Sequence, residues 1–232
     1  MDTKVYKTNK GPYKFLKIVM VWPPSFCNTD AEDIDCDKPL IDDRFTIHGG
    51  WTMYTATKWV APYNKTGCHT TEIPLPAEAI TRELLGELVP DMIHLWPDVE
   101  FYLNETKTDD FWKYQWVKHG MCFKHPTNPK IYFQTTINIP KTYNFLQILN
   151  QGGYNPDNGF YNATKMATTV NDALGVDAEL RCNKNTLGNV QLHEIWVRLN
   201  RTDVLIPIGR PSTGNCPTDK LIQFPSATLV SD

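Results

Sequence analysis

The chain has 232 residues, of which 41% are hydrophobic and 12% aromatic, enough to fill a substantial core. Its mean hydropathy is −0.40, and no apolar run approaches the roughly 18 residues that a membrane span needs, so we expect no membrane contact. A formal net charge of −3 and a pI near 6.1 exclude a protein that holds nucleic acid through a broad basic surface. Any nucleic-acid site must be a local cluster within an acidic chain.

Cysteines and glycosylation sequons indicate a secreted glycoprotein, extracellular or vacuolar. No CxxC is present, which makes a zinc ribbon or a thioredoxin motif a poor explanation of the cysteines. Residues 1–7 lack the apolar core of a signal peptide, so we expect that one has been removed; the alternative is a cytosolic chain. The six cysteines are Cys27, Cys36, Cys68, Cys122, Cys182 and Cys216, and the four N-x-Ser/Thr sequons begin at Asn64, Asn104, Asn162 and Asn200.

Residues 1–12 are predicted to form a loose leader, and residues 13–232 a single domain. Residues 14–21 are apolar and rich in β-formers, which predicts a core strand stopped by the Trp-Pro-Pro that follows. Residues 25–43 are acidic and irregular, and a bridge between Cys27 and Cys36 could close a small loop there. Residues 44–48 predict a short strand that ends at the Gly49-Gly50 pair.

Helices are predicted in the middle of the chain, from apolar residues at helical spacing and from capping residues. One of them begins at Asp109 or Asp110, places Trp112 and Trp116 on the core, and stops at Gly120 in the left-handed conformation. Another is capped by Asn162. The predicted ranges are 77–88, 109–120, 140–150 and 163–174.

Near the C-terminus, alternating apolar residues predict a strand over 195–199 that pairs with 204–208 across a turn at 200–203. Helices gather in the middle and strands at the flanks. The sequence therefore predicts an α+β fold, a single domain with an antiparallel sheet packed with several helices.

Two segments could carry chemistry. Gln115, Lys118 and His119 would share one face of the second predicted helix, although a solvated surface is the commoner meaning of such a face. His48 ends an apolar strand, and taken alone it is more simply a buried, hydrogen-bonded histidine. The other histidines receive structural interpretations: surface or loop positions for His69, His94 and His125, and a structural role in a strand for His193.

Together the two segments resemble a known family. Residues 45–51 (FTIHGGW) and 111–122 (FWKYQWVKHGMC) look like the two catalytic segments of the T2-type ribonucleases, in the plant group that includes the self-incompatibility (S-) ribonucleases. Four shorter matches stand in the same order, VWPPSFC, LWPDVE, ELRC and LHEI, so that the resemblance covers about residues 13–225.

The resemblance implies a metal-free, cofactor-free transesterification of single-stranded RNA through a 2′,3′-cyclic phosphate by a monomer. In these roles His119 is the general base, His48 the general acid and Lys118 the group that stabilises charge on the phosphorane. Trp51 matches a residue that stacks on a base, and Phe111 one that lines the neighbouring base site.

Four positions depart from the family pattern. Tyr114, at a substrate-binding position, and Gln115, at a catalytic position, stand where relatives usually have His-Glu. The carboxylate beside His119 is therefore missing, and we expect the pKa of His119 to be lower than in those relatives. Gly50 and Thr52 replace Leu and Pro, which we expect to loosen the turn that holds His48 and to weaken activity.

The resemblance also implies three disulfides, Cys27–Cys36, Cys68–Cys122 and Cys182–Cys216. A fourth pair, usual in plant members, is absent because Arg198 and Ile208 stand at its two positions.

The leading function is an active endoribonuclease. A finer version is a self-incompatibility ribonuclease, which would imply an F-box-type protein partner, although pI 6.1 is acidic for that group. The runner-up is a related storage or defence protein with weak or no turnover. A plain RNA-binding module is disfavoured by the acidic balance.

Overall fold

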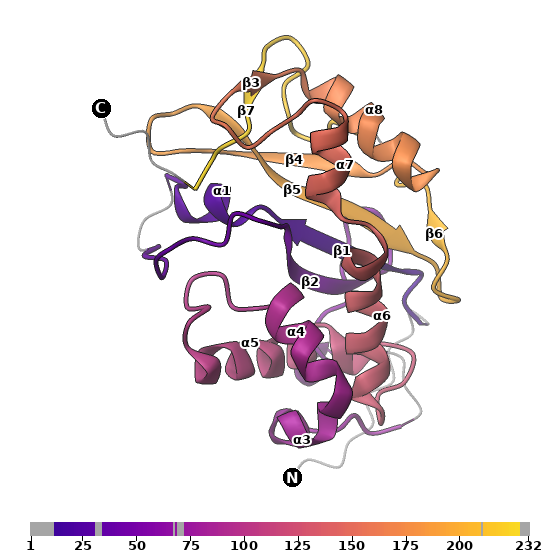
Figure 1. The fold of residues 1–232 in the computed structure, drawn as a ribbon. Coiled ribbons are helices and arrows are strands. Elements are labelled where there is room, and N and C mark those ends of the chain that lie inside the picture. The colour runs from indigo at the N-terminus through magenta and orange to yellow at the C-terminus, as the bar shows by residue number, and fades with distance from the viewer. Residues whose placement is uncertain (1–11, 31–33, 67, 69–71, 210, 228–232) are drawn as a thin grey trace.

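The computed structural model describes residues 12–30, 34–66, 68, 72–209 and 211–227 (Figure 1). The predicted leader and His69 lie outside these residues, apart from Pro12. The strands are β1 Phe15–Val21, β2 Thr46–Met53, β3 Phe160–Tyr161, β4 Glu179–Lys184, β5 Val190–Leu199, β6 Leu205–Ile206 and β7 Ile222–Gln223. The α-helices are α1 Pro23–Cys27, α2 Tyr63–Thr66, α3 Arg82–Leu85, α4 Val89–Leu95, α5 Glu105–Lys118, α6 Pro129–Thr142, α7 Phe145–Gln151 and α8 Ala163–Leu174. Short 3-10 helices are η1 Ala77–Ala79, η2 Gly86–Leu88 and η3 Gly120–Cys122.

One seven-stranded sheet organises the domain, with strand order β2-β1-β5-β7-β3 and with β4 and β6 also paired to β5. All pairings are antiparallel except the single contact between β5 and β7. Strand β1 is buried along its whole length, as its apolar sequence predicts. Its charged residue, Lys17, is buried as well. The predicted α+β class and antiparallel sheet are confirmed.

The helices lie in two groups around the sheet. In Figure 1, α3, α4, α5 and α6 lie on the β2 side, while α7 and α8 lie beside β4 and β5. Helix α5 is fixed to its group by two fully buried indoles, as predicted. Trp112 Nε1 donates to the Trp96 carbonyl (2.7 Å) and Trp116 Nε1 to the Leu75 carbonyl (2.8 Å), so each ring contributes both apolar area and a satisfied donor.

Two predicted helices have different bounds. The range 77–88 is divided into η1, α3 and η2, because Thr81 caps a new turn and Gly86 turns the chain at φ +56°. The range 140–150 was wrong because Pro140 lies in the last turn of α6 rather than at a helix start. The new helix α7 begins after Asn144, whose side chain accepts from the Gln147 amide.

Helix α5 also differs from its prediction at both ends. It begins at Glu105, where Asn104 caps it by accepting from the Lys107 amide, and not at Asp109 or Asp110. It ends at Lys118. Gly120 is not left-handed; a Cβ there would overlap the Trp116 ring, so this glycine is needed for close packing.

Helix α8 and the C-terminal strand pair were predicted in the right places, although β5 begins at Val190 rather than at 195 and β6 covers only two of the residues predicted over 204–208. Helix α8 has the predicted bounds, with the Asn162 side chain accepting from the Lys165 amide. Strand β5 pairs with β6 across the predicted turn. The three bridges Cys27–Cys36, Cys68–Cys122 and Cys182–Cys216 are formed. Arg198 and Ile208, at the positions of the missing fourth pair, are both buried, and the Arg198 guanidinium lies 4.5 Å from the centroid of a phenylalanine ring.

Candidate active site

His48 lies in a β-bulge inside β2. Val19 of β1 pairs with Gly49, and the next residue, Met20, pairs with Ile47, so His48 is the extra residue of its strand. A bulge adds one residue and re-aims its side chain. His48 and Trp51 thereby both become half-exposed and contact each other, with ring centroids 5.6 Å apart. The predicted turn at Gly49-Gly50 was therefore wrong, since the strand continues to Met53.

Gly50 and Thr52 are packed within this strand rather than loosening it. The Gly50 carbonyl accepts from the Tyr132 hydroxyl (2.9 Å), and a Cβ at Gly50 would lie 2.6 Å from Thr136 Oγ1. Thr52 is fully buried, and its hydroxyl donates to the His119 carbonyl (3.3 Å). The expectation that these residues loosen a turn at His48 is corrected: Thr136 fills the space that a larger residue at position 50 would need.

Gly50→Ala is expected to lower the free energy of unfolding by about 1–3 kcal/mol, because the added methyl group overpacks a filled site. Urea denaturation measures the change. The matched double variant Gly50→Ala/Thr136→Ala removes the obstructing atoms, so the two substitutions should be less costly together than their separate effects added. Strictly additive costs would contradict this packing account.

His119 is the residue that ends α5. Its amide still donates to the Gln115 carbonyl (3.0 Å), but its φ of −134° takes it out of the helix. The imidazole is only 7% exposed and lies between two indoles, with centroids 5.8 Å from both Trp51 and Trp59. Burial, and then the charges of neighbouring His48, Lys118 and Lys17, lower the pKa of His119 from 6.5 to about 3. The ring is therefore neutral at ordinary pH.

Gln115 connects α5 to β2. Its Nε2 donates to the His48 carbonyl (3.0 Å), so this amide fixes the backbone of the bulge rather than contacting the His119 ring. Its Oε1 is buried with no hydrogen-bond partner among the described residues, and a Cβ at Gly49 would lie 2.6 Å from it. The structure thus brings together His48, Trp51, Gln115 and His119, four of the predicted site residues.

The three other predicted site residues lie along α5. The Lys118 ammonium is 5.2 Å from the centre of the Tyr114 ring, which is 52% exposed. Lys118 is close enough to His119 to lower its pKa. Phe111 is partly buried against the core. Tyr114, Lys118 and Phe111 therefore flank the two histidines along the helix without being in ring contact with them in the described structure.

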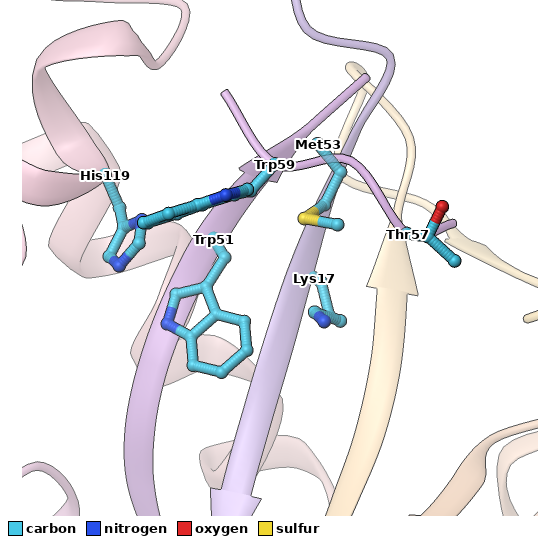
Figure 2. Close-up of a pocket in the computed structure, with 6 residues that line it drawn as sticks. All are labelled: Lys17, Trp51, Met53, Thr57, Trp59 and His119. Carbon is cyan, nitrogen blue, oxygen red and sulfur yellow. The ribbon is translucent and has the colours of Figure 1, made fainter. Parts of the chain in front are cut away.

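A cavity of about 280 Å³ opens beside His119. Figure 2 shows the Trp59 ring extending toward His119, with Trp51 beneath it and Lys17 on the neighbouring strand. Lys17 Nζ lies 4.5 Å from the Trp51 centroid and 3.7 Å from that of Trp196. Such an opening between indoles suits a flat, aromatic ligand. The lining residues are Lys17, Trp51, Met53, Thr57, Trp59 and His119.

Glu194 on β5 completes the surroundings of His48. Its Oε1 lies 2.6 Å from His48 Nδ1, and its Oε2 accepts from Trp196 Nε1 (2.7 Å). Burial disfavours the carboxylate, but the hydrogen bond and charge of His48, with smaller contributions from His193 and Trp196, prevail and hold the pKa of Glu194 below its usual value. His193 Nδ1 is hydrogen-bonded to the Ser25 hydroxyl (3.1 Å).

Sequence reasoning missed Glu194, Trp59 and Lys17 as parts of this site. The signals were present but weak. Glu194 stands in the LHEI match, and Lys17 is a charged residue in the middle of a buried apolar strand, where an unpaired ammonium would be costly. Trp59 follows no motif, and only the fold brings it to His119.

Comparison with known proteins identifies the family of the chain. The family model described as "Ribonuclease T2 family" matches residues 13–216. The chain therefore belongs to the ribonuclease T2 family, and the prediction of an enzyme of this class is confirmed.

In the described part of the chain, every helix is too short or too polar to cross a lipid bilayer.

Three of the curated relatives are plant proteins that the chain matches over most of their length. Ribonuclease 1 of Arabidopsis thaliana is 28% identical over 217 residues, covering 92% of this chain and 87% of the relative. Intracellular ribonuclease LX of Solanum lycopersicum is 28% identical over 227 residues, covering 95% and 87%. A ribonuclease-like storage protein of Panax ginseng is 26% identical over 231 residues, covering 95% and 86%.

Solved structures share the fold. RNase NT, solved in complex with 5′-AMP, superposes with a TM-score of 0.73 at 24% identity, covering 92% of this chain and 98% of that one. The self-incompatibility-associated SF11-RNase of Nicotiana alata superposes with a TM-score of 0.69 at 21% identity, covering 92% and 99%. At these identities the likeness establishes the fold alone. The predicted resemblance to the plant group is confirmed by the family match and the curated plant relatives.

Proposed function

We propose that this protein is an endoribonuclease that cleaves single-stranded RNA by transesterification, with His48 and His119 as its proton-transfer pair. The observation that carries the proposal is that one indole, Trp51, contacts both imidazoles, while their environments differ. His119 is buried and neutral, whereas His48 is half-exposed and hydrogen-bonded to a carboxylate. Two imidazoles with opposite protonation states are what this chemistry requires.

The proposed roles follow from those environments. Neutral His119 accepts the proton of the ribose 2′-hydroxyl as the O2′–P bond forms. The P–O5′ bond breaks, and the leaving 5′-oxygen takes a proton from protonated His48, which yields a 2′,3′-cyclic phosphate. Lys118 stabilises the charge that develops on the phosphorane oxygens. No metal or cofactor takes part in the proposed steps.

The aromatic cavity is the proposed base site. We propose that a base of the RNA stacks on Trp51 within it, opposite the exposed indole of Trp59, a contact worth about 1–3 kcal/mol per base. Phe111 and Tyr114, farther along α5, are proposed to contact the neighbouring nucleotide. A local aromatic site of this kind allows an acidic protein to bind a polyanion without a broad basic surface.

Incubation with yeast RNA in EDTA tests the proposal. The wild type should release acid-soluble nucleotides, whereas the double variant His48→Ala/His119→Ala should release almost none. No release by the wild type, or equal release by the two proteins, would overturn the proposed activity.

The missing carboxylate at position 115 predicts an unusual pH dependence. Gln115→Glu should raise the pKa of His119 by adding a negative charge on the α5 turn that precedes it, and so move the acidic limb of the pH–rate profile to higher pH. The pH dependence of kcat/KM measures the shift. Gln147→Glu, which adds the same charge to an exposed position on α7, serves as the control. Superimposable acidic limbs for wild type and Gln115→Glu would contradict the prediction.

The second candidate function is a storage or defence protein with weak turnover. It is favoured by Tyr114 and Gln115 at the positions of the usual His-Glu pair, and by the similarity to the ginseng storage protein. A role in self-incompatibility, which would bring an F-box-type partner, is supported by the fold shared with SF11-RNase, whereas the acidic pI argues against it. Comparing kcat/KM with that of an active plant relative separates the first two candidates.

We further propose that the protein passes through the secretory pathway as a monomer, to an extracellular or vacuolar destination. Three disulfides support this, because such bridges persist in oxidising compartments. The sequons at Asn64, Asn104, Asn162 and Asn200 are the proposed glycan sites, and the four asparagines are exposed or half-exposed. Mass spectrometry before and after enzymatic deglycosylation of the secreted protein reads their occupancy.

A further inference from the structure

We infer that Glu194 is a positioning residue for His48: its carboxylate holds the imidazole with the proton on Nδ1, so that Nε2 alone faces the substrate. The catalytic consequence of this arrangement rests on the function proposed above, whereas the arrangement itself can be tested without RNA.

The carboxylate of Glu194 is matched to two donors. Oε1 faces His48 Nδ1 at 2.6 Å, and Oε2 accepts from Trp196 Nε1 at 2.7 Å. The indole N–H can only donate, so it fixes the rotation of the carboxylate and leaves Oε1 for the histidine. A carboxylate accepts at both ends, whereas an amide accepts at one end and donates at the other. Glutamine at this position could therefore satisfy only one of the two donors.

Both residues of this pair lie at irregular points of the sheet. His48 is the extra residue of the bulge in β2. On β5, Glu194 pairs with Arg181 while the next pair joins Cys182 to Leu192, so His193 is the extra residue of a second bulge, directly before Glu194. Bulges re-aim side chains next to functional sites. These two bring a histidine of β2 and a glutamate of β5 together, although β1 lies between their strands.

His193 does not compete with His48 for this role. The Ser25 hydroxyl donates to the Trp22 carbonyl (2.8 Å), so its oxygen accepts from His193 Nδ1 (3.1 Å). Burial lowers the pKa of His193, as does the charge of His48, and these effects outweigh the opposing charge of Glu194. Neutral His193 therefore turns an unprotonated Nε2 toward Glu194, at 3.9 Å, and leaves His48 as the donor to Oε1.

This arrangement suits a general acid that must be used again. A proton on Nδ1 that is held by Glu194 keeps the ring in one orientation while Nε2 gives its proton to the leaving oxygen. The neutral ring left behind has its lone pair on Nε2, directed at the same place, where it can accept a proton from water when the cyclic phosphate is opened. No ring rotation is needed between the two steps.

Nitrogen-15 NMR of the imidazoles in the ligand-free protein tests the arrangement directly. In the wild type, neutral His48 should be protonated on Nδ1, and Glu194→Gln should shift its population toward the Nε2-protonated form. Glu179→Gln is the matched control, because Glu179 is also a buried strand carboxylate but pairs with Arg181. Neutral wild-type His48 protonated mainly on Nε2 would overturn the inference even if no variant folds.

RNA cleavage supplies the second readout. Glu194→Gln should lower kcat about 100-fold with KM nearly unchanged, since a misplaced general acid affects proton transfer rather than binding. Glu179→Gln should stay within about twofold of the wild type. An unchanged kcat in Glu194→Gln, or an equal loss in both variants, would overturn the positioning role. Absence of cleavage by the wild type would instead count against the proposed function, and the NMR result would stand separately.

Discussion

His119→Ala is expected to lower kcat for RNA cleavage by about 10²–10⁴-fold, the range that a positioned proton-transfer group contributes. The reason is specific to its setting. The ring is buried between Trp51 and Trp59 with a pKa near 3, so it is ready to accept a proton at any ordinary pH. The cavity left by alanine admits water, but water in an unfixed position cannot replace an oriented base. Initial rates on a dinucleotide substrate measure the loss.

His48→Ala should produce a loss of similar size, and the double variant should lose little more than either single variant, because the two groups act in one step. His125→Ala is the control, since His125 is exposed and lies outside both motifs. Thermal unfolding of each variant separates lost chemistry from lost folding. Retention of more than about a tenth of the wild-type kcat by His119→Ala would contradict its role as general base.

Removal of the Cys68–Cys122 bridge, by Cys68→Ala/Cys122→Ala, is expected to lower the free energy of unfolding by about 4 kcal/mol. The estimate follows from the entropy of closing a loop with a sequence separation of 54 residues. Cys122 ends η3, which begins directly after His119. The loss should therefore also raise local mobility at His119 and reduce kcat at temperatures where the protein is still folded.

The Cys27–Cys36 bridge provides the comparison, because its separation is only 9 residues and the same relation gives about 3 kcal/mol. Guanidinium denaturation of both double variants under non-reducing conditions measures the difference. Equal or reversed costs would show that loop entropy does not control the contribution of these bridges. An unchanged kcat without Cys68–Cys122 would contradict the link between this bridge and His119.

The sequence identified the residues of the site better than their geometry. His48 and His119 were found from two motifs, and the cysteine pairs from the family resemblance. The bulge at His48 could not be predicted, because it depends on the register with β1, which is set by contacts far along the chain. The motif's two glycines suggested a turn, whereas the fold uses Gly50 for close packing on Thr136.

Long-range contacts account for the remaining differences. Glu194 is 146 residues from His48, and Trp59 is 60 positions before His119, so no local pattern links these pairs. Gln115 lies at the candidate site, but its hydrogen-bond partner, the His48 carbonyl, comes from another element and could not be predicted locally. Helix boundaries failed where capping decided them, as at Asn104 and Asn144, because several polar residues near each boundary could serve as caps.

The most direct test of the central claim is phosphorus NMR of a dinucleotide incubated with the protein in EDTA. The account predicts that a 2′,3′-cyclic phosphate appears first as the substrate disappears, that the 2′-deoxy analogue stays intact, and that the His48→Ala/His119→Ala variant forms no cyclic product. Cleavage of the deoxy analogue, or a linear phosphate as the first product, would contradict it, because either outcome requires a nucleophile other than the ribose 2′-hydroxyl.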